Sequence, residues 1–309
     1  MNRLLTVAFI LFFQQVVFAE KVLIITSAYN RPDFIEIQHK TFKQFMQDDY
    51  EFIVFNDARA PSLQRGIENT CAKLGIRCVN IPQYIHDLPY LERSPGEGFH
   101  NPAVRNANVV QYALNNIGFK HNGIVAIIDS DMFLFQPFSI KDFLGGYEMA
   151  GIPQGYSKNK IEIQYLWIGI AFLDMARLPE KELINFNCGL IEGVPVDAGG
   201  YTYHYIQKHP ELRLRLFGAL HSDNIFCSAC RLSPPLCNHN RDFYPQGLDD
   251  EQINLLRSGS FNVEFICNGA FFHYRGGTNW DHQTNAFHEK KTHLFNEYIH
   301  KILLRNEAP

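Results

Sequence analysis

The chain has 309 residues, of which 46% are hydrophobic, 19% charged and 14% aromatic. This composition is typical of a globular protein with enough apolar residues for a core, and it excludes an intrinsically disordered chain. The length suits one large domain. The formal net charge of −4 argues against a basic nucleic-acid-binding surface.

The first residues have the pattern of a secretory signal peptide. Arg3 is followed by an apolar run at residues 4–13, and the segment closes at Ala19, where small residues suit a signal peptidase. Gln14 and Gln15 leave the apolar run shorter than the ~20 residues of a spanning helix. We therefore expect residues 1–19 to be cleaved and the protein to be exported (periplasmic, secreted or lumenal). The alternative is an uncleaved N-terminal anchor.

Seven cysteines follow this segment, so an oxidising compartment would favour disulfides and leave at least one free thiol. Cys71 and Cys78 flank a short loop and form the best local pair. A second group has spacing that suits either a zinc ion or a disulfide: Cys227, Cys230, Cys237 and His239.

Strand-like and helix-like segments alternate along the first half of the chain. We expect strands at 21–31, 51–58 and 77–82, a fourth strand that starts at 123 and stops at acidic residues, and helices at 32–45, 62–74 and 101–117. In the second half we expect strands at 148–154, 166–175 and within 261–274, with helices at 249–256 and 284–304. This alternation is typical of an α/β protein with a parallel sheet, in which ligands bind beyond the carboxyl ends of the strands. Residues 20–309 are predicted to form one domain.

An Asp-x-Asp pattern is the sharpest chemical signal. Asp129 and Asp131, with Ser130 between them, interrupt an apolar run that extends from 124 to 135. Two buried like charges without a partner would cost several kcal/mol per ion. A divalent cation would offset this cost, and carboxylate oxygens suit Mn²⁺ or Mg²⁺, which also bind phosphates. The alternative is an acidic strand end exposed to water.

With these motifs the sequence resembles the metal-dependent glycosyltransferases of the GT-A fold, the nucleotide-diphospho-sugar transferase superfamily. The similarity covers most of residues 21–280, and its specific parts are the Asp-x-Asp motif and a late segment at 272–277 that contains His273. It implies a Rossmann-like mixed, mostly parallel sheet flanked by helices, with a nucleotide-binding half at about 20–140 and an acceptor half at about 141–309. It also implies sugar transfer from a nucleotide-diphosphate sugar, such as a UDP-sugar, to an unidentified glycan or protein acceptor.

The resemblance implies roles for individual residues. Asp129, Asp131 and His273 would hold Mn²⁺ or Mg²⁺, although a core histidine is the plain alternative for His273. A general base for the acceptor hydroxyl stays open among Asp197, Asp250 and Glu251, and Asp197 could equally be a turn residue. The nucleotide sugar would be bound by a larger set: Thr26, Ala28, Tyr29, Asn30, Asp57, Arg105, Asp129, Ser130, Gly199, Gly200 and Arg275.

Two other functions fit parts of the pattern. A non-catalytic nucleotide-sugar- or glycan-binding protein could keep the same fold. A metal-dependent hydrolase could use the two aspartates and His273 together with His221 and Asp223, but hydrolase sites usually have tighter His/Asp spacing than this.

Overall fold

The computed structural model describes residues 20–87, 101–158, 161–221, 263–277 and 284–305. The predicted signal peptide, the helix expected at 249–256, Asp250, Glu251 and the second cysteine group lie outside these ranges. None of the helices within them is long and apolar enough to cross a membrane.

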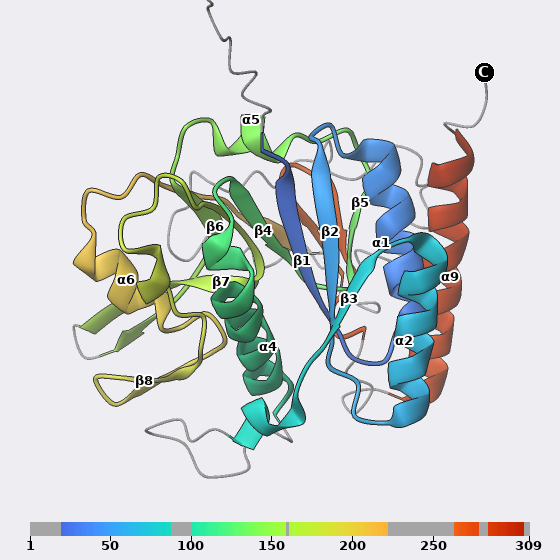
Figure 1. Ribbon diagram of the computed structural model, residues 1–309, viewed down its shortest axis with the longest axis horizontal. Coiled ribbons are helices and arrows are strands. Elements are labelled where there is room, and N and C mark those ends of the chain that lie inside the picture. The colour runs from blue at the N-terminus through green and yellow to red at the C-terminus, as the bar shows by residue number, and fades with distance from the viewer. Residues whose placement is uncertain (1–19, 88–100, 159–160, 222–262, 278–283, 306–309) are drawn as a thin grey trace, which may run out of the picture.

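A seven-stranded sheet forms the centre of the fold, in the order β10-β6-β7-β4-β1-β2-β3 (Figure 1). Only β7 runs antiparallel to its neighbours in this sheet, so the predicted mixed, mostly parallel sheet is confirmed. The strands are β1 (Val22–Ala28), β2 (Tyr50–Asn56), β3 (Arg77–Asn80), β4 (Ile124–Ile128), β6 (Met149–Lys158), β7 (Ile161–Asp174) and β10 (Leu214–Leu216).

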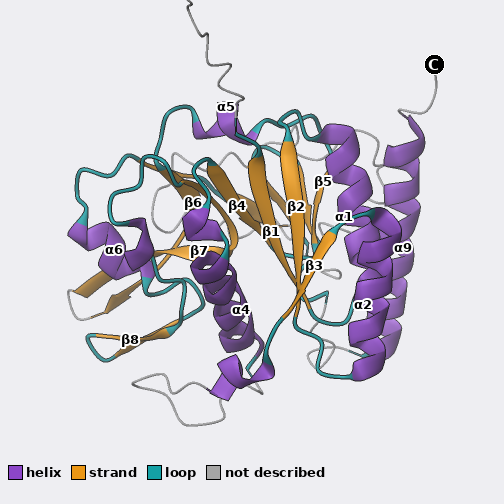
Figure 2. Cartoon of the chain, in the orientation of Figure 1, coloured by secondary structure: helices purple, strands orange, loops and turns teal. Residues whose placement is uncertain are grey.

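Helices flank both faces of this sheet (Figure 2). Alternate residues of β1 point to opposite faces: Val22 and Ile24 join one core cluster, and Leu23 and Ile25 join the other. The first cluster includes residues of α1 (Pro32–Phe45), α2 (Pro61–Leu74) and α9 (Asn285–Arg305). The second includes residues of α4 (Pro102–Asn116) and α6 (Thr202–Lys208).

Local signals set several helix ends. Pro32 and Pro102 occupy the first turns of α1 and α4, where a missing N–H has no cost. The Asn101 side chain accepts hydrogen bonds from the first backbone N–H groups of α4. Gly75 ends α2 in the left-handed conformation, with φ at 68°.

A second, antiparallel sheet of four strands has the order β11-β12-β13-β5. Its strands are β11 (Ala219–His221), β12 (Glu264–Ile266), β13 (Phe271–His273) and β5 (Met132–Leu134). The chain leaves the central sheet at the end of β4, turns through the acidic residues and enters β5. The sequence predicted where β4 stops but not this second sheet.

Short elements complete the described chain. They are the 3-10 helices η1 (Gln83–Asp87), η2 (Gly118–Lys120) and η3 (Lys181–Leu183), the helix α5 (Ile140–Leu144) and the hairpin of β8 (Gly189–Ile191) with β9 (Val194–Val196).

Candidate metal and nucleotide site

The Asp-x-Asp turn lies between β4 and β5, at the carboxyl end of β4. The backbone N–H of Asp129 donates to the carbonyl of Gly169 on β7 (2.8 Å). The fully buried amide of Gln38 on α1 donates to the carbonyls of Asp129 and Met132, both at 3.0 Å. Since both ends of the turn are held by neighbouring elements, the position of its carboxylates is fixed by the fold.

The Asp-x-Asp turn lies next to His273 because β13, which carries His273, pairs with β5 in the second sheet. His273 on β13 is opposite Met132 on β5, so its ring reaches the residue before Met132. Nε2 of His273 lies 3.3 Å from Oδ1 of Asp131. One ligand atom from each of Asp129, Asp131 and His273 lies within 4.8 Å of the others. The structure thus brings together the three residues that the sequence analysis expected to share a cation.

Each of these three side chains has a further protein partner. Nδ2 of Asn106 on α4 donates to Oδ1 of Asp129 (3.0 Å), and the backbone N–H of Gly277 donates to Oδ2 of Asp131 (3.0 Å). Nδ1 of His273 lies 2.9 Å from Oε2 of Glu264 on β12. The partners orient the ligand atoms toward one another.

Burial and the charges of neighbouring groups shift the pKa values of all three side chains in the cluster. Burial and the nearby Asp131 raise the pKa of Asp129 to about 6. Burial alone would also raise the pKa of Asp131, but His273 and the N–H of Gly277 hold it below its usual range. Burial opposes a charge on His273, yet Asp131 and Glu264 raise its pKa to about 9. The two carboxylates therefore favour a positive partner between them.

This donor set fits a divalent cation. Two carboxylate oxygens with one imidazole nitrogen are ligands that Mn²⁺ accepts. Burial and, after it, the charge of Asp131 raise the pKa of Asp129, and a cation would offset both effects. The side chains of Asp131 and His273 are already buried and oriented, so binding would need little rearrangement.

A buried lysine lies beside the cluster. Lys291 on α9 is 3% exposed; its Nζ donates to the carbonyl of Arg275 (3.0 Å) and lies 4.2 Å from the ring centroid of Tyr274. Burial lowers the pKa of Lys291 to about 7, although the charge of Asp131 acts in the opposite direction. Sequence reasoning missed this residue, because nothing in a C-terminal amphipathic helix marks one lysine as buried.

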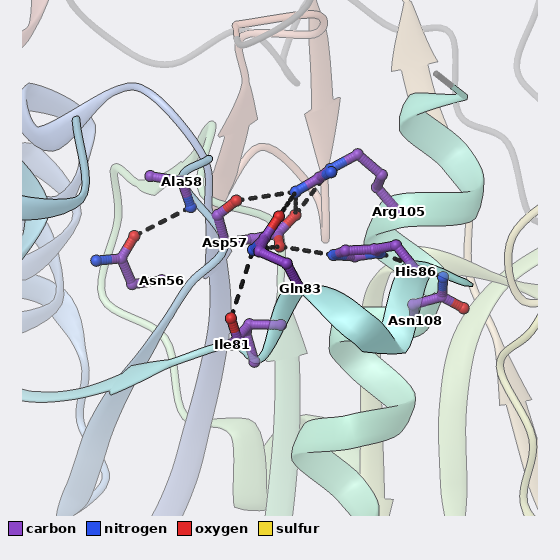
Figure 3. Close-up of polar contacts among 8 residues, drawn as sticks. All are labelled: Asn56, Asp57, Ala58, Ile81, Gln83, His86, Arg105 and Asn108. Atoms are coloured by element: carbon purple, nitrogen blue, oxygen red, sulfur yellow. Dashed lines mark hydrogen bonds and ion pairs between the residues drawn. The ribbon is translucent and has the colours of Figure 1, made fainter. Parts of the chain in front are cut away.

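A second polar network lies at the carboxyl end of β2, centred on Asp57 (Figure 3). Oδ2 of Asp57 accepts from Nε (3.0 Å) and Nη2 (2.6 Å) of Arg105. Oδ1 accepts from Nε2 of His86 (2.8 Å) and from Nε2 of Gln83 (3.3 Å). Nδ1 of His86 is 3.3 Å from the amide nitrogen of Asn108. Asp57 and Arg105, separated by 48 residues in the sequence, are thus brought together as a buried ion pair.

This network bears on the prediction that Asp57 binds the nucleotide sugar directly. Both of its oxygens are already engaged by protein donors, so a direct bond from ribose or base to Asp57 would have to displace one of them. Nη1 of Arg105, by contrast, is buried and has no hydrogen-bond partner among the described residues. The guanidinium carbon of Arg105 lies 5.1 Å from the ring centroid of Tyr29, and the buried hydroxyl of Thr26 also lacks a described partner.

The remaining nucleotide-site predictions in the first half take positions at the same edge of the sheet. Ala28 ends β1, and its carbonyl accepts from the N–H of Asp57 (2.8 Å). Asn30 is half-buried just after β1, and Ser130 is buried inside the Asp-x-Asp turn. In the second half of the chain, Arg275 follows β13 and places Nη1 3.2 Å from Oε1 of Glu264. Their roles toward a nucleotide sugar stay predictions.

The segment around Asp197 is organised by protein contacts. Asp197 is exposed, and its Oδ1 accepts from the N–H of Ala198 (2.7 Å), a contact typical of a turn residue. Gly199 has a φ of 93°, and a Cβ there would lie 1.9 Å from the carbonyl oxygen of Leu166 on β7. A Cβ at Gly200 would lie 2.3 Å from the side chain of Val196. Both glycines permit close packing within the protein. A role of Asp197 as a base stays a prediction.

The Cys71–Cys78 pair is also found in contact. Cys71 on α2 and Cys78 on β3 are free thiols that share a hydrogen bond, which raises the pKa of Cys71 and lowers that of Cys78. The structure thus places the expected partners side by side without a bond between them, and the disulfide stays a prediction.

Comparisons with known proteins give distant structural likenesses. No family model matches the sequence, and no curated protein matches it. One similar structure is glucosyl-3-phosphoglycerate synthase from Mycobacterium tuberculosis, determined with Mn²⁺, UDP and glucosyl-3-phosphoglycerate. It is 14% identical, with a TM-score of 0.38 over 64% of this chain and 69% of that chain.

Two further likenesses are to the bifunctional glycosyltransferase WbbM and the S. cerevisiae mannosyltransferase Ktr4p. WbbM is 10% identical, with a TM-score of 0.43 over 84% of this chain and 46% of that chain. Ktr4p is 11% identical, with a TM-score of 0.37 over 53% of this chain and 58% of that chain. All three are glycosyltransferases, the class that the sequence resembles. The likenesses are too distant to carry a functional argument.

Proposed function

We propose that this protein is a metal-dependent glycosyltransferase that moves a sugar from a nucleotide-diphosphate sugar, most simply a UDP-sugar, to a glycan or protein acceptor. The observation that carries the proposal is the convergence of Asp129, Asp131 and His273 at the carboxyl end of β4, with ligand atoms within 4.8 Å. In an open α/β sheet this edge is where ligands bind.

The reaction explains why a cation site and the polar network around Asp57 belong together. The bond between the anomeric carbon and the donor's diphosphate oxygen breaks, and a bond from that carbon to the acceptor oxygen forms. The acceptor proton passes to a base, for which Asp197, Asp250 and Glu251 are the candidates. Mn²⁺ or Mg²⁺ held by Asp129, Asp131 and His273 would supply positive charge to the leaving diphosphate.

The chain's own residues do the positioning. Asn106 and Gly277 orient the two carboxylates, and Gln38 holds their turn in place. The Asp57–Arg105 ion pair keeps the guanidinium rigid, and its Nη1, buried and without a described partner, would donate to a nucleotide that displaces the side chains covering it. The positions of these two groups of residues are consistent with a diphosphate at the Asp-x-Asp turn and a nucleoside toward β2.

The test is a donor screen with Mn²⁺ that compares the wild type with Asp131→Asn. The asparagine keeps an oxygen for the N–H of Gly277, which an alanine would leave unpaired, so the fold is retained while a charged ligand is lost. We expect Mn²⁺-dependent UDP binding and sugar transfer or slow donor hydrolysis in the wild type, with a loss of activity of about 100-fold or more in the variant.

Other outcomes would point to the competing functions. Metal-dependent nucleotide binding without turnover would indicate a binding protein, and cleavage of phosphoesters without nucleotide preference would indicate a hydrolase. Transfer that is fully retained in Asp131→Asn or in excess EDTA would contradict the proposed role of the cation.

Export is a separate part of the proposal. It is supported by the apolar segment before Ala19 and predicts a mature chain that begins at Glu20. An exported transferase needs a compartment that contains donor, such as a lumen that imports nucleotide sugars or a host cell. N-terminal sequencing of the protein after fractionation of the producing cells tests it. A cytosolic chain that still carries residues 1–19 would contradict it.

A further inference from the structure

Three acidic and basic side chains form a row across the second sheet. Asp131 directly precedes β5, His273 lies on the adjacent strand β13, and Glu264 lies on β12, directly opposite His273 in the strand register. Glu264 is 6% exposed, which is rare for a glutamate unless it has partners. The sequence analysis did not single out Glu264, because one glutamate in a strand has no distinguishing pattern.

The geometry of this row sets the roles of the two imidazole nitrogens. Nδ1 of His273 lies 2.9 Å from Oε2 of Glu264, whereas Nε2 is the nitrogen that faces Asp131. An ionised carboxylate only accepts hydrogen bonds, so Nδ1 must carry the proton in this contact. The lone pair of a neutral ring is then on Nε2, where it faces the carboxylate cluster.

Glu264 is itself held in place. Its second oxygen, Oε1, lies 3.2 Å from Nη1 of Arg275, so both oxygens of the carboxylate have a partner and its rotation is restricted. The ring of Trp167 on β7 lies against the imidazole of His273, with 5.3 Å between the ring centroids. The imidazole is therefore fixed by a hydrogen bond along one edge and by an aromatic contact on another side.

We propose that Glu264 is a positioning residue that holds His273 in the orientation and tautomer required to bind a divalent cation through Nε2. The inference deepens the proposed function and rests on it, since it presupposes the cation shared by Asp129, Asp131 and His273. A carboxylate behind a metal-bound histidine fixes the ring and raises its basicity, and its loss typically weakens metal binding 10–100-fold.

The test is the affinity for Mn²⁺ alone, measured from the electron paramagnetic resonance signal of the free ion during titration. Glu264→Gln keeps the shape of the side chain but removes its charge and one of its two acceptor oxygens. We expect it to bind Mn²⁺ about 10–100-fold more weakly than the wild type. An unchanged affinity would overturn the inference.

A double-mutant cycle separates positioning through His273 from a direct effect of charge. If Glu264 acts through the imidazole, Glu264→Gln should cause almost no further loss of affinity in a His273→Gln background. A loss of the same size in both backgrounds would show that Glu264 acts independently of His273, and it would overturn the inference.

Glu148→Gln is the matched control. Like Glu264, Glu148 is a carboxylate held by two basic side chains, here Arg177 and Arg213, but it lies just before β6, where the amino end of that strand is on the side of the central sheet opposite the site. Its replacement should leave the Mn²⁺ affinity unchanged. An equal loss in Glu148→Gln would show that the effect in Glu264→Gln is general destabilisation, and it would overturn the inference.

A measurement on the wild type guards against a variant that does not fold. Long-range ¹H–¹⁵N spectra of the protein saturated with diamagnetic Zn²⁺ should show His273 protonated at Nδ1 and metal-bound at Nε2, and the reverse would overturn the inference.

The proposed function is tested apart from this by sugar transfer. A wild type that binds Mn²⁺ but transfers no sugar contradicts the proposed function alone, whereas a wild type that binds no Mn²⁺ contradicts both.

Discussion

Replacement of the buried lysine beside the cluster should stabilise the protein. Burial lowers the pKa of Lys291 from 10.5 to about 7, and one pKa unit corresponds to about 1.4 kcal/mol, so keeping the charged form in the fold costs about 5 kcal/mol. The variant, however, leaves the carbonyl of Arg275 without its donor and loses the contact with the Tyr274 ring, which costs about 2–4 kcal/mol. We therefore expect Lys291→Met to raise the free energy of unfolding by about 1–3 kcal/mol at pH 6.

The pH dependence of this gain follows from the direction of the pKa shift. The folded-state pKa lies below the unfolded one, so the unfolded chain binds more protons between about pH 7 and pH 10.5. The wild type therefore gains stability as pH rises through this window, because the cost of the buried charge disappears. The advantage of Lys291→Met should be largest below pH 7 and should shrink toward zero or reverse near pH 10.

Urea unfolding of both proteins at pH 6, 8 and 10 in EDTA measures this gain. Other groups titrate alike in the two proteins, so their contribution cancels in the difference between the two free energies of unfolding. EDTA keeps cations away from Asp131, whose charge opposes the lowering of the lysine pKa. Lys290→Met is the matched control, because Lys290 is the exposed neighbour on the same helix and should change stability by less than about 0.5 kcal/mol. A Lys291→Met variant that is no more stable than the wild type at pH 6, or whose gain is independent of pH, would refute the reasoning.

Two further stability predictions follow from the fold. Gly199→Ala should lower the free energy of unfolding by more than about 3 kcal/mol in urea titrations, because its φ is 93° and the new Cβ would collide with the carbonyl of Leu166. Gly193→Ala has a similar φ of 76° but open space around it, so about 1 kcal/mol is expected, and equal losses at the two positions would contradict the argument. Asp57→Asn should cost about 3 kcal/mol in the same assay, because Arg105 stays buried without its counter-charge. An unchanged unfolding midpoint would show that the ion pair contributes nothing to stability.

Much of the local structure could be predicted from the sequence. The helix expected at 32–45 has those bounds in the structure, and the ends of strands β1, β2 and β3 lie within three residues of the ends of the predicted segments. These predictions succeed because they depend on signals within one segment: apolar periodicity, a proline in the first helical turn and glycine at a helix end.

The site was predictable only in part. The Asp-x-Asp motif could be placed at a strand end from its own sequence, and His273 was found through a resemblance to known enzymes. Gln38, Glu264, Lys291 and His86 were not singled out, although each contacts or adjoins the residues that were. No local pattern distinguishes these side chains from others of the same type on a helix or strand.

The sequence by itself determined where strands alternate with helices and where two carboxylates interrupt a buried strand. These features depend on the spacing of apolar and polar side chains within one segment, so residues close in the sequence are enough to predict them. Only the tertiary structure decided that the chain enters a second sheet after Ser130 and Asp131, and that β13 pairs with β5 so that His273 meets the carboxylates. It also decided that α9 buries Lys291 beside them. These contacts join residues that are far apart in the sequence, such as Phe271 and Leu134, and the free energy that selects them comes from packing whole elements together.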